Sequence, residues 1–401
     1  MPARPPLDPR AVAARLRTHY RNRRRDWLAG GGPWPLAVPL HPPSEREAAR
    51  ELEAARAWIG AWQSWIGPGE LVWTERTWFS LGRQLLPERL LLQSADQVAD
   101  WIGESVRWMS AVTRARGLAE RFPALDACLG SHYDWLADSA DAEIECLTAV
   151  LAYLSDHPDS RLYIRQLPIS GVDSKWIAAN RARVTELLRP LLGREGDLHE
   201  IAGLRREPIL LRMRVLDPQL RSTVGGLEDI TAPVEQVAAL DLRPSRILIV
   251  ENLQTGLAFT DLPGSLVLMG QGYAVDVFGR IPWLCDVPCD YWGDLDTHGL
   301  AILDRLRGYL PQARSLLMDE ATLLDHRDLW GQEAKPLGRQ DLPRLDDAEK
   351  ELYDGLAGDR WGRSVRLEQE RIGWDYACRR VSEKEAVPAC PTIPAPSHQN
   401  H

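Results

Sequence analysis

Three acidic residues in the C-terminal half of the sequence have the type and spacing to bind a divalent metal ion. Glu251 directly follows the apolar run 246–250, and Asp294 and Asp296 follow a strand-like run that begins at Asp290. Side chains at positions i and i+2 of an extended chain point the same way, so the two aspartates should face one side together. Carboxylates held close to one another repel unless a cation or a proton intervenes. The pattern therefore predicts a site for a hard cation such as Mg²⁺ or Mn²⁺.

A site of this kind suits phosphodiester cleavage, because one or two divalent ions can activate water and stabilise the leaving oxygen. We expect Asp294 and Asp296 to bind the metal, and Glu251 to be a further ligand or the general acid or base. Asp290 shares their parity but lies roughly 13 Å back along the strand, at about 3.3 Å per residue, and should not join them. The alternative for the D-x-D pair alone is a solvated turn, which is common.

The elements that must position these acids are alternating strands and helices from residue 236 to about 385. Apolar runs at 246–250 and 265–269 predict buried strands, and further strands are expected at 290–293 and 313–318. A Gly-rich turn closes the second strand, and Thr297 should cap the helix that follows the third. Repeated β–α units of this length favour a parallel sheet, in which ligands bind at the carboxyl ends of the strands. The three acids should therefore meet at one edge.

The first 155 residues are predicted to be mostly helical. Ser44 opens a capping-box signature, and apolar residues recur at helical spacing after it, from about 94 to 116 and from 136 to 154. The run 71–79 is rich in β-branched and aromatic residues and predicts a strand. We expect the tryptophans of this region to have a packing role, and no residues here indicate chemistry.

The segment from 156 to about 235 has the order strand, helix, strand. Strands are predicted at 161–167 and 209–216, and a helix at 175–188 that Asp173 or Ser174 can cap. Between Asp159 and Arg221 there are 12 basic and 8 acidic residues, although the whole chain is acidic. A winged-helix DNA-binding element has this order, but so does a solvated helix with a hairpin. The residues leave both interpretations open.

Composition limits the class of protein. The net charge of −9 excludes a uniformly basic nucleic-acid coat, but not local basic surfaces. Six cysteines without a C-x-x-C pair indicate reduced thiols. Neither a signal-peptide core nor a long apolar run is present, so we expect a soluble, cytoplasmic protein that does not span a membrane. The Pro-rich tail, 391–401, is expected to be disordered.

Several of these segments resemble known families. Ile249-Val-Glu-Asn252 followed by Gly293-Asp-Leu-Asp296 resembles the Toprim domain of topoisomerases, primases and related nucleases. The segments 162–175 (LYIRQLPISGVDSK) and 366–372 (RLEQERI) are more specific and resemble the JetD family. These proteins are the nuclease subunits of the Wadjet anti-plasmid defence systems. The resemblance covers nearly the whole chain and is strongest from about 160 to 380.

The resemblance implies an α/β multidomain protein related to the topoisomerase VI A subunit. It implies a helical N-terminal arm domain over 1–155, a winged-helix (CAP-like) domain over 156–235 and a C-terminal Toprim domain over 236–390 with a Rossmann-like parallel sheet. Glu251, Asp294 and Asp296 take the places of the Toprim metal-binding acids. It further implies a homodimer that cuts double-stranded plasmid DNA together with an SMC-type, MukBEF-like condensin complex (JetABC). The sequence thus predicts a Mg²⁺- or Mn²⁺-dependent endodeoxyribonuclease.

Two other functions remain open. Topoisomerase VI and its relatives attack DNA with a tyrosine in the winged-helix domain, where this chain offers only Tyr163 and no adjacent tyrosine pair. Because packed tyrosines are common in strands, we favour hydrolysis over transesterification. A DNA-binding adaptor without catalytic activity is the second alternative. Glu368 and Glu370 stay outside the predicted site, because a solvated helix face explains them equally well. His298 also stays outside it, because a residue in the first turn of a helix is expected to have a structural role.

Overall fold

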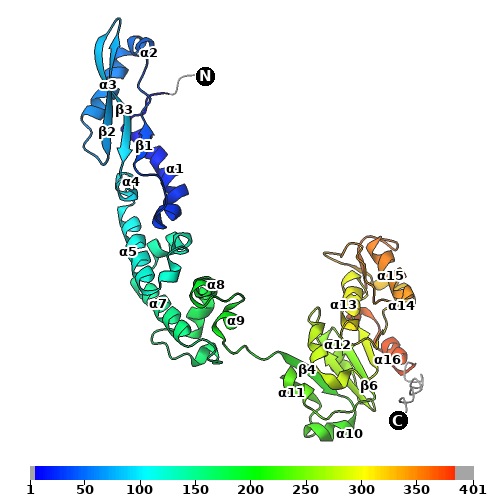
Figure 1. Ribbon diagram of the computed structural model, residues 1–401. Helices are drawn as coiled ribbons and strands as arrows, with labels where there is room; N and C mark the ends of the chain where they lie inside the picture. The colour runs from blue at the N-terminus through cyan, green and yellow to red at the C-terminus, as the bar shows by residue number, and fades with distance from the viewer. Residues whose placement is uncertain (1–4, 384–401) are drawn as a thin grey trace, which may run out of the picture. The chain divides into compact units, whose positions relative to one another are not determined.

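The computed structural model describes residues 5–383, which form a mixed α/β protein of two compact units that divide between Glu207 and Pro208. In Figure 1 the N-terminal unit runs from blue to green and the C-terminal unit from green to red. Each unit has a hydrophobic core of its own. The predicted tail, 391–401, lies outside the described residues.

The N-terminal unit is mostly helical, as predicted, and holds one small antiparallel sheet in the order β1–β3–β2. Its strands are β1 (Leu36–Pro39), β2 (Glu70–Trp78) and β3 (Gly82–Leu92). Its helices are α1 (Pro9–Leu28), α2 (Glu45–Arg50), α3 (Leu52–Gln63), α4 (Ala95–Ile102), α5 (Ser105–Arg121), α6 (Tyr133–Asp138), α7 (Asp141–Asp156), α8 (Ser174–Leu192) and α9 (Leu198–Ala202). Short 3-10 turns are η1 (Pro123–Leu125), η2 (Leu129–His132) and η3 (Ile164–Gln166).

Local sequence signals set the ends of these helices. The capping box is confirmed, because the Ser44 backbone N–H donates to the Glu47 carboxylate at 2.8 Å and the Ser44 hydroxyl accepts from the Glu47 N–H. Asp173 caps α8 by accepting from the Trp176 N–H at 2.7 Å. The predicted helix over 94–116 is two helices, since Gly103 ends α4 at a φ of 81°.

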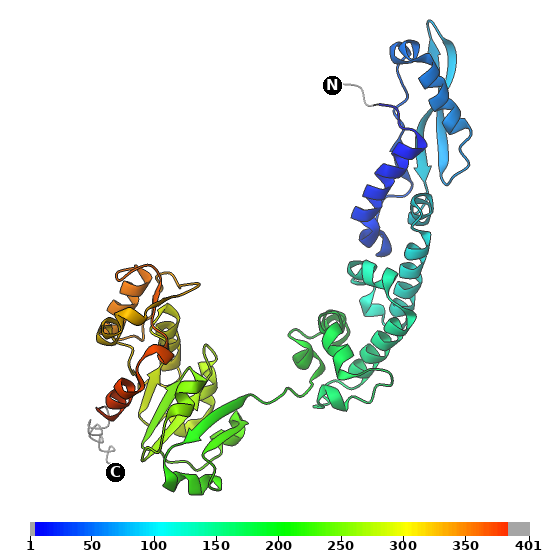
Figure 2. The same cartoon turned by 180° about the vertical axis from the view of Figure 1, so that it is seen from behind.

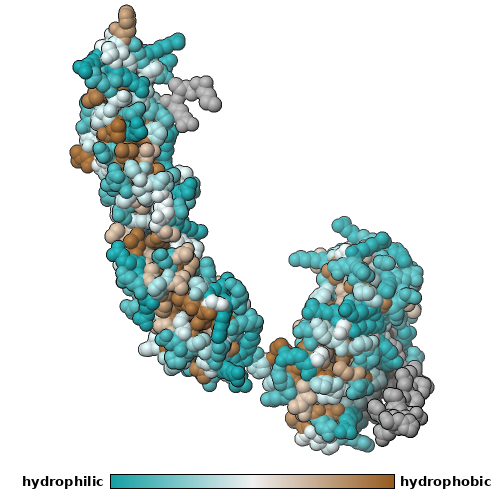
Figure 3. Space-filling view, viewed as in Figure 1, coloured by the Kyte–Doolittle hydropathy of each residue, from teal (hydrophilic) through white to brown (hydrophobic). Residues whose placement is uncertain are grey.

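The packing role expected of the tryptophans is confirmed for those at the core of this unit. Trp58 and Trp62 are buried, and both indole N–H groups donate to the Leu7 carbonyl, at 2.8 and 2.9 Å. Not every large apolar side chain is covered, because Ile66 and Phe79, at the two ends of β2, are almost fully exposed. Figure 3 shows hydrophobic residues interrupting the hydrophilic surface of this unit at several places.

The predicted strand at 161–167 is wrong. Its centre is the 3-10 turn η3, and Arg161 has a φ of 55°, which a strand cannot adopt. No strand pairs with this segment; instead Leu162 and Ile164 pack into the helical core. The alternating apolar pattern therefore reflects burial against helices rather than sheet pairing.

The second strand of the same predicted module, β4 (Leu210–Val215), does form, but within the sheet of the C-terminal unit. The helix of the module, α8, belongs to the N-terminal unit. The winged-helix assignment over 156–235 is therefore not confirmed, and the Toprim assignment likewise stays a prediction.

The C-terminal unit contains a six-stranded sheet in the order β5–β4–β7–β6–β8–β9. Its strands are β4 with β5 (Asp229–Pro233), β6 (Arg246–Val250), β7 (Ser265–Met269), β8 (Cys289–Trp292) and β9 (Ala313–Ser315), and a separate ribbon pairs β10 (Gly331–Gln332) with β11 (Val365–Arg366). The helices are α10 (Pro218–Arg221), α11 (Val234–Ala238), α12 (Leu253–Ala258), α13 (Thr297–Arg307), α14 (Glu320–Asp325), α15 (Asp347–Ala357) and α16 (Trp374–Glu383). The 3-10 turns are η4 (Ser222–Val224), η5 (Val275–Arg280), η6 (Pro282–Leu284), η7 (Arg327–Leu329) and η8 (Gln369–Arg371).

The four strands predicted around the acids are confirmed, and they form the parallel part of this sheet, β7–β6–β8–β9. The sheet as a whole is mixed, because β4, which precedes the predicted parallel region, runs antiparallel to both β5 and β7. Figures 1 and 2 show the mixed sheet from opposite sides.

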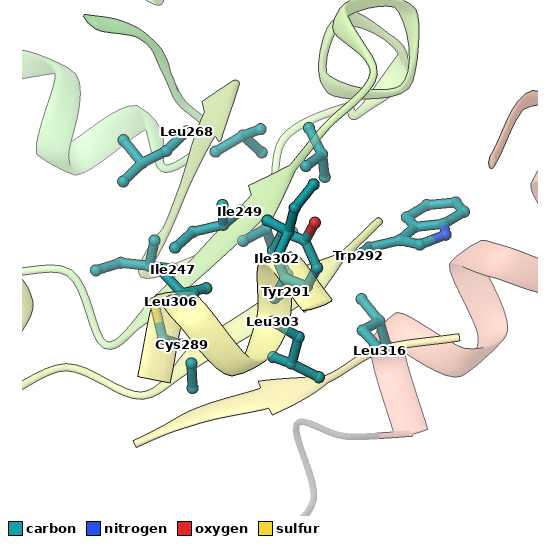
Figure 4. Packing of buried hydrophobic residues seen from close by; sticks show 14 of the residues in the cluster. Ile247, Ile249, Leu268, Cys289, Tyr291, Trp292, Ile302, Leu303, Leu306 and Leu316 are labelled. Atoms are coloured by element: carbon teal, nitrogen blue, oxygen red, sulfur yellow. The ribbon is translucent and has the colours of Figure 1, made fainter. Parts of the chain in front are cut away.

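The centre of the sheet is buried on both faces, as continuous apolar runs require. Every residue of β6, β7 and β8 is buried. On one face α13 packs against the sheet, and Figure 4 shows its Ile302 and Leu306 among side chains of β6 and β8. This packing fixes the strand ends from which the acids project. Within the described residues, none of the helices has the length and apolar character needed to cross a bilayer.

Candidate active site

The predicted acids follow the carboxyl ends of two neighbouring parallel strands. β6 and β8 are adjacent, with Val250 opposite Trp292, and Glu251 continues the pairing by donating its N–H to the Trp292 carbonyl at 3.2 Å. The Glu251 carboxylate accepts a hydrogen bond from the Asp294 backbone N–H and a longer one, 3.4 Å, from the Tyr291 hydroxyl. The structure thus brings Glu251 and the aspartate loop together at one edge of the sheet.

The electrostatics of the three acids are coupled. Burial raises the pKa of Glu251, and the charges of Asp294 and Asp296 raise it further. Burial likewise raises the pKa of Asp296 to about 6, against its hydrogen bond with Gly299, and Glu333 and Asp294 add to the increase. Negative charge therefore accumulates where little water can solvate it, which is the condition that favours binding of a cation or a proton.

Asp296 is fixed by the helix that it begins. Its Oδ1 accepts from the Gly299 N–H at 2.8 Å, so Asp296, and not Thr297 as predicted, is the N-cap of α13. Thr297 is the first helical residue, and its hydroxyl contacts the buried Glu333 carboxylate at 2.7 and 2.8 Å. The cap uses one carboxylate oxygen of Asp296 and leaves the other, Oδ2, to face the site.

A segment far along the chain, residues 365–371, crosses these strand ends; we call it the crossing segment. Its Gln369 N–H donates to Asp294 Oδ1 at 2.9 Å, and the Gln369 side chain donates to the Trp292 carbonyl. The same side chain accepts from the Asn252 N–H at 3.2 Å, so Gln369 links the carboxyl ends of β6 and β8. Arg366 donates to Asp294 Oδ2 and lies 3.2 Å from Asp296 Oδ2.

The residues left outside the predicted site have contacts of their own. Glu368 pairs with Arg366 at 3.4 Å and with Arg371 at 3.0 Å, and Glu370 accepts from the Asn252 side chain at 2.6 Å. These contacts place the two glutamates next to the acids, in the crossing segment. Glu370 is exposed and lies in the 3-10 turn η8, whereas Glu368 is half-buried and directly precedes that turn.

His298 is held between two partners. Its Nδ1 lies 2.5 Å from the Tyr273 hydroxyl and its Nε2 lies 2.9 Å from the Lys335 carbonyl. A carbonyl only accepts, so Nε2 carries a proton, and in the neutral ring the Tyr273 hydroxyl donates to Nδ1. The structural role expected of His298 agrees with this arrangement.

Asp290 is absent from the site, as expected from its distance along β8. It is fully buried and pairs with Arg246 at 2.8 Å and with Arg314 at 3.1 Å. Tyr163, the alternative nucleophile, lies in the N-terminal unit, where the Arg205 guanidinium stacks over its ring at 5.0 Å.

Three residues that contact the acids were not predicted from the sequence: Arg366, Gln369 and Tyr291. Glu333, whose charge raises the pKa of Asp296, was not predicted either. Arg366 and Gln369 stand in the segment that carried the family resemblance, which was the one available signal for them. Glu333 has no local pattern, and its place is set only by the β10–β11 ribbon.

The donors at this edge are all oxygens, which fits a hard divalent ion in kind. Within residues 5–383, however, no group of three or more His, Cys, Asp or Glu side chains stands ready to hold a metal ion. One Asp294 oxygen is bonded to the Gln369 N–H, and the other faces the Arg366 guanidinium.

Comparison with known families covers most of the chain. Residues 203–381 match the family described as Wadjet protein JetD, C-terminal. Residues 9–189 match the family described as an uncharacterized protein conserved in bacteria, N-term (DUF3322). No curated protein matches the chain. With its C-terminal unit matched almost throughout by the first family and its N-terminal unit by the second, the chain belongs to the JetD family of Wadjet proteins.

Proposed function

We propose that this chain is the DNA-cleaving subunit of a Wadjet system, a Mg²⁺- or Mn²⁺-dependent endodeoxyribonuclease acting at Glu251, Asp294 and Asp296. Family membership places the protein in Wadjet defence, with other Wadjet components as partners. The observation that carries the enzymatic proposal is the meeting of Glu251 with the Asp294–Asp296 loop at the ends of adjacent parallel strands. In open α/β sheets this is where substrates and ions bind.

The chemistry follows from the groups at this edge. A divalent ion, when bound, supplies a Lewis acid for a phosphate oxygen and lowers the pKa of bound water. Asp294 and Oδ2 of Asp296, the oxygen that the helix cap does not use, would hold the ion. Glu251, whose pKa is raised by burial and by its acidic neighbours, is suited to take up a proton from the attacking water. Its hydrogen bonds from Asp294 N–H and Tyr291 orient that carboxylate.

DNA as the substrate is supported by a basic face on α1. Arg10, Arg17 and Arg21 are spaced by seven and four residues, so they lie on one side of this 20-residue helix, and all three are exposed. Within the described residues none of the three has an ion-pair partner. Unpaired arginines in a chain of net charge −9 fit the phosphates of a nucleic acid.

The wider assembly is also part of the proposal. We take the protein to work as a homodimer in which each subunit cuts one strand of double-stranded plasmid DNA. An SMC-type, MukBEF-like complex (JetABC) delivers the DNA. The winged-helix and Toprim assignments belong to the same proposal.

Plasmid cleavage tests the enzymatic claim. Purified protein with Mn²⁺ and supercoiled plasmid should yield nicked and linear products, and Asp294→Ala should reduce cleavage at least a hundredfold. Asp276→Ala is the matched control, because Asp276 is an exposed aspartate of the same unit that forms an ion pair with Arg305 at 3.5 Å, away from the three acids. Cleavage by Asp294→Ala at the wild-type rate would exclude this site, and absence of cleavage with any metal and partner would favour the adaptor.

A further inference from the structure

The guanidinium of Arg366 is surrounded by acidic groups, and each of its three nitrogens faces a different carboxylate. Nη2 donates to Asp294 Oδ2, Nε lies 3.2 Å from Asp296 Oδ2, and Nη1 lies 3.4 Å from Glu368 Oε1. Two of these carboxylates are the acids expected to bind metal. Arg366 therefore stands at the point on which the acids converge, which is the place that a metal ion bound by them would take.

The backbone around Arg366 is held by hydrogen bonds, but the Arg366 side chain is partly exposed and less constrained. Leu367 and Leu295 exchange two backbone hydrogen bonds of 2.9 and 3.1 Å, and Arg366 pairs with Gly331 in the β10–β11 ribbon. The Arg366 side chain is 33% exposed, whereas Arg246, a structural partner of Asp290, is 8% exposed. Of the three contacts only the one to Asp294 is a hydrogen bond, and Nε is buried without one. A change of side-chain rotamer can therefore withdraw the guanidinium without moving the strands.

Charge favours an exchange of this arginine for a divalent ion. Asp294, Asp296 and Glu368 carry up to three negative charges around one positive charge, and Glu251 adds a fourth negative group nearby. A divalent ion supplies twice the charge of a guanidinium and accepts shorter contacts from oxygen. Arg366 has the opposing advantage of being attached to the protein, so its local concentration is always high.

We propose that Arg366 is an internal counter-cation that occupies the metal position of the unloaded site and must withdraw before a divalent ion binds. Arg366 thereby sets the affinity of the site for metal, and the protein rests in a form that is closed to its cofactor. This inference rests on the proposed function, because it requires the acids to bind metal. It explains why the oxygens at this edge do not form a ready metal site although their chemistry fits one.

Mn²⁺ binding by the full-length protein tests the inference directly, through isothermal titration calorimetry without DNA. Arg366→Gln removes the competing charge, so its dissociation constant for Mn²⁺ should fall roughly tenfold or more. This factor corresponds to a wild-type protein in which at most about a tenth of the molecules have the guanidinium withdrawn at any time. Arg371→Gln is the matched control, because Arg371 lies in the same segment and pairs with Glu368 but with neither aspartate. Its dissociation constant should stay within about threefold of wild type, which accounts for the loss of charge alone.

Thermal unfolding gives a second readout that does not depend on activity. In EDTA, Arg366→Gln should lower the midpoint of unfolding of the C-terminal unit, because three carboxylates lose their counter-charge. Saturating Mn²⁺ should then raise that midpoint more in the variant than in wild type. If Arg366→Gln does not fold, Arg366→Lys serves instead, since it keeps one charge but loses the three-way contact, and it should bind Mn²⁺ more tightly than wild type by a smaller factor.

The outcomes separate this inference from the proposed function. If wild type binds Mn²⁺ and cleaves DNA but Arg366→Gln binds Mn²⁺ no more tightly, the counter-cation role is wrong and the nuclease proposal stands. Binding by Arg366→Gln but not by wild type, with Asp294→Ala removing it, supports the counter-cation role in its strongest form. If neither protein binds Mn²⁺ and neither cleaves DNA, the metal site itself is refuted.

Discussion

Asp296 serves two partners, since one of its oxygens caps α13 and the other faces Arg366. In the metal-free protein its pKa is raised from 3.8 to about 6, chiefly by burial. The folded state therefore binds this proton more tightly than the unfolded state does. Stability should fall as the pH rises from about 4 to 6, and the full cost of the charge is present above that window.

Asp296→Asn tests this pH dependence, because asparagine keeps the helix cap and removes the charge. The free energy of unfolding of the variant relative to wild type should increase by up to roughly 3 kcal/mol between pH 4 and pH 7, at about 1.4 kcal/mol for each unit of pKa. Urea unfolding in EDTA at four pH values measures the difference. Parallel curves for the two proteins would show that Asp296 ionises normally.

Tyr163 distinguishes hydrolysis from transesterification at the level of a single hydroxyl. Its ring stacks against Arg205, and its backbone N–H donates to Gln166 Oε1 at 2.9 Å. Neither contact uses the hydroxyl, so phenylalanine can keep both. Tyr163→Phe should therefore cleave plasmid at a rate within about twofold of wild type, and detergent-quenched reactions should contain no DNA linked to protein. A dead variant together with linked DNA in the wild-type reaction would establish the tyrosine mechanism.

At the scale of elements, α13 can begin where it does because residue 299 has no side chain. A Cβ at Gly299 would lie 2.0 Å from the Asp294 carbonyl oxygen, a backbone atom that cannot move aside. Gly299→Ala should displace the start of α13 from the aspartate loop, destabilise the unit by about 1–3 kcal/mol and weaken Mn²⁺ binding at least tenfold. Gly373→Ala, where a Cβ has no neighbour within 4 Å, is the control and should change neither quantity.

The basic face of α1 gives a second prediction at this scale. Replacing Arg10, Arg17 and Arg21 together by glutamine should weaken DNA binding while leaving Mn²⁺ affinity unchanged. Each lost phosphate contact reduces the slope of log K against log salt by about 0.9, so the triple variant should reduce it by about 2 to 3. The same substitutions at Arg83, Arg50 and Arg56, which have acidic partners on the same unit, form the control.

Sequence predicted the elements around the site better than the contacts within it. The bounds of β6 and β7 were predictable to the residue, because a short, continuous apolar run is typical of a central parallel strand that is buried on both faces. The 161–167 segment failed because short apolar runs look alike whether helices or strands cover them. Arg366 and Gln369 reach the acids from a distant part of the chain, and no local pattern encodes a contact that only tertiary pairing creates.

At the scale of the whole molecule, the two cores should behave as separate folding units. The core residues of 1–207 and those of 208–401 fall into different clusters. Scanning calorimetry in EDTA should resolve two transitions. Leu248→Ala, at a fully buried position of β6, should destabilise the C-terminal unit by about 2–5 kcal/mol and lower the midpoint of its transition alone. Leu188→Ala in α8 should lower only the midpoint of the N-terminal unit. A single transition shifted by both variants would show that the units unfold together.

The crossing segment also has a consequence for how the protein is made. A ribosome synthesises β6 and β8, with all three acids, well before it reaches residues 365–371. Until that segment emerges, Asp294 lacks both its bond from the Gln369 N–H and its contact with Arg366. The nascent chain therefore completes this edge of the sheet only late in translation, and the acids of β6 and β8 remain without these partners until then.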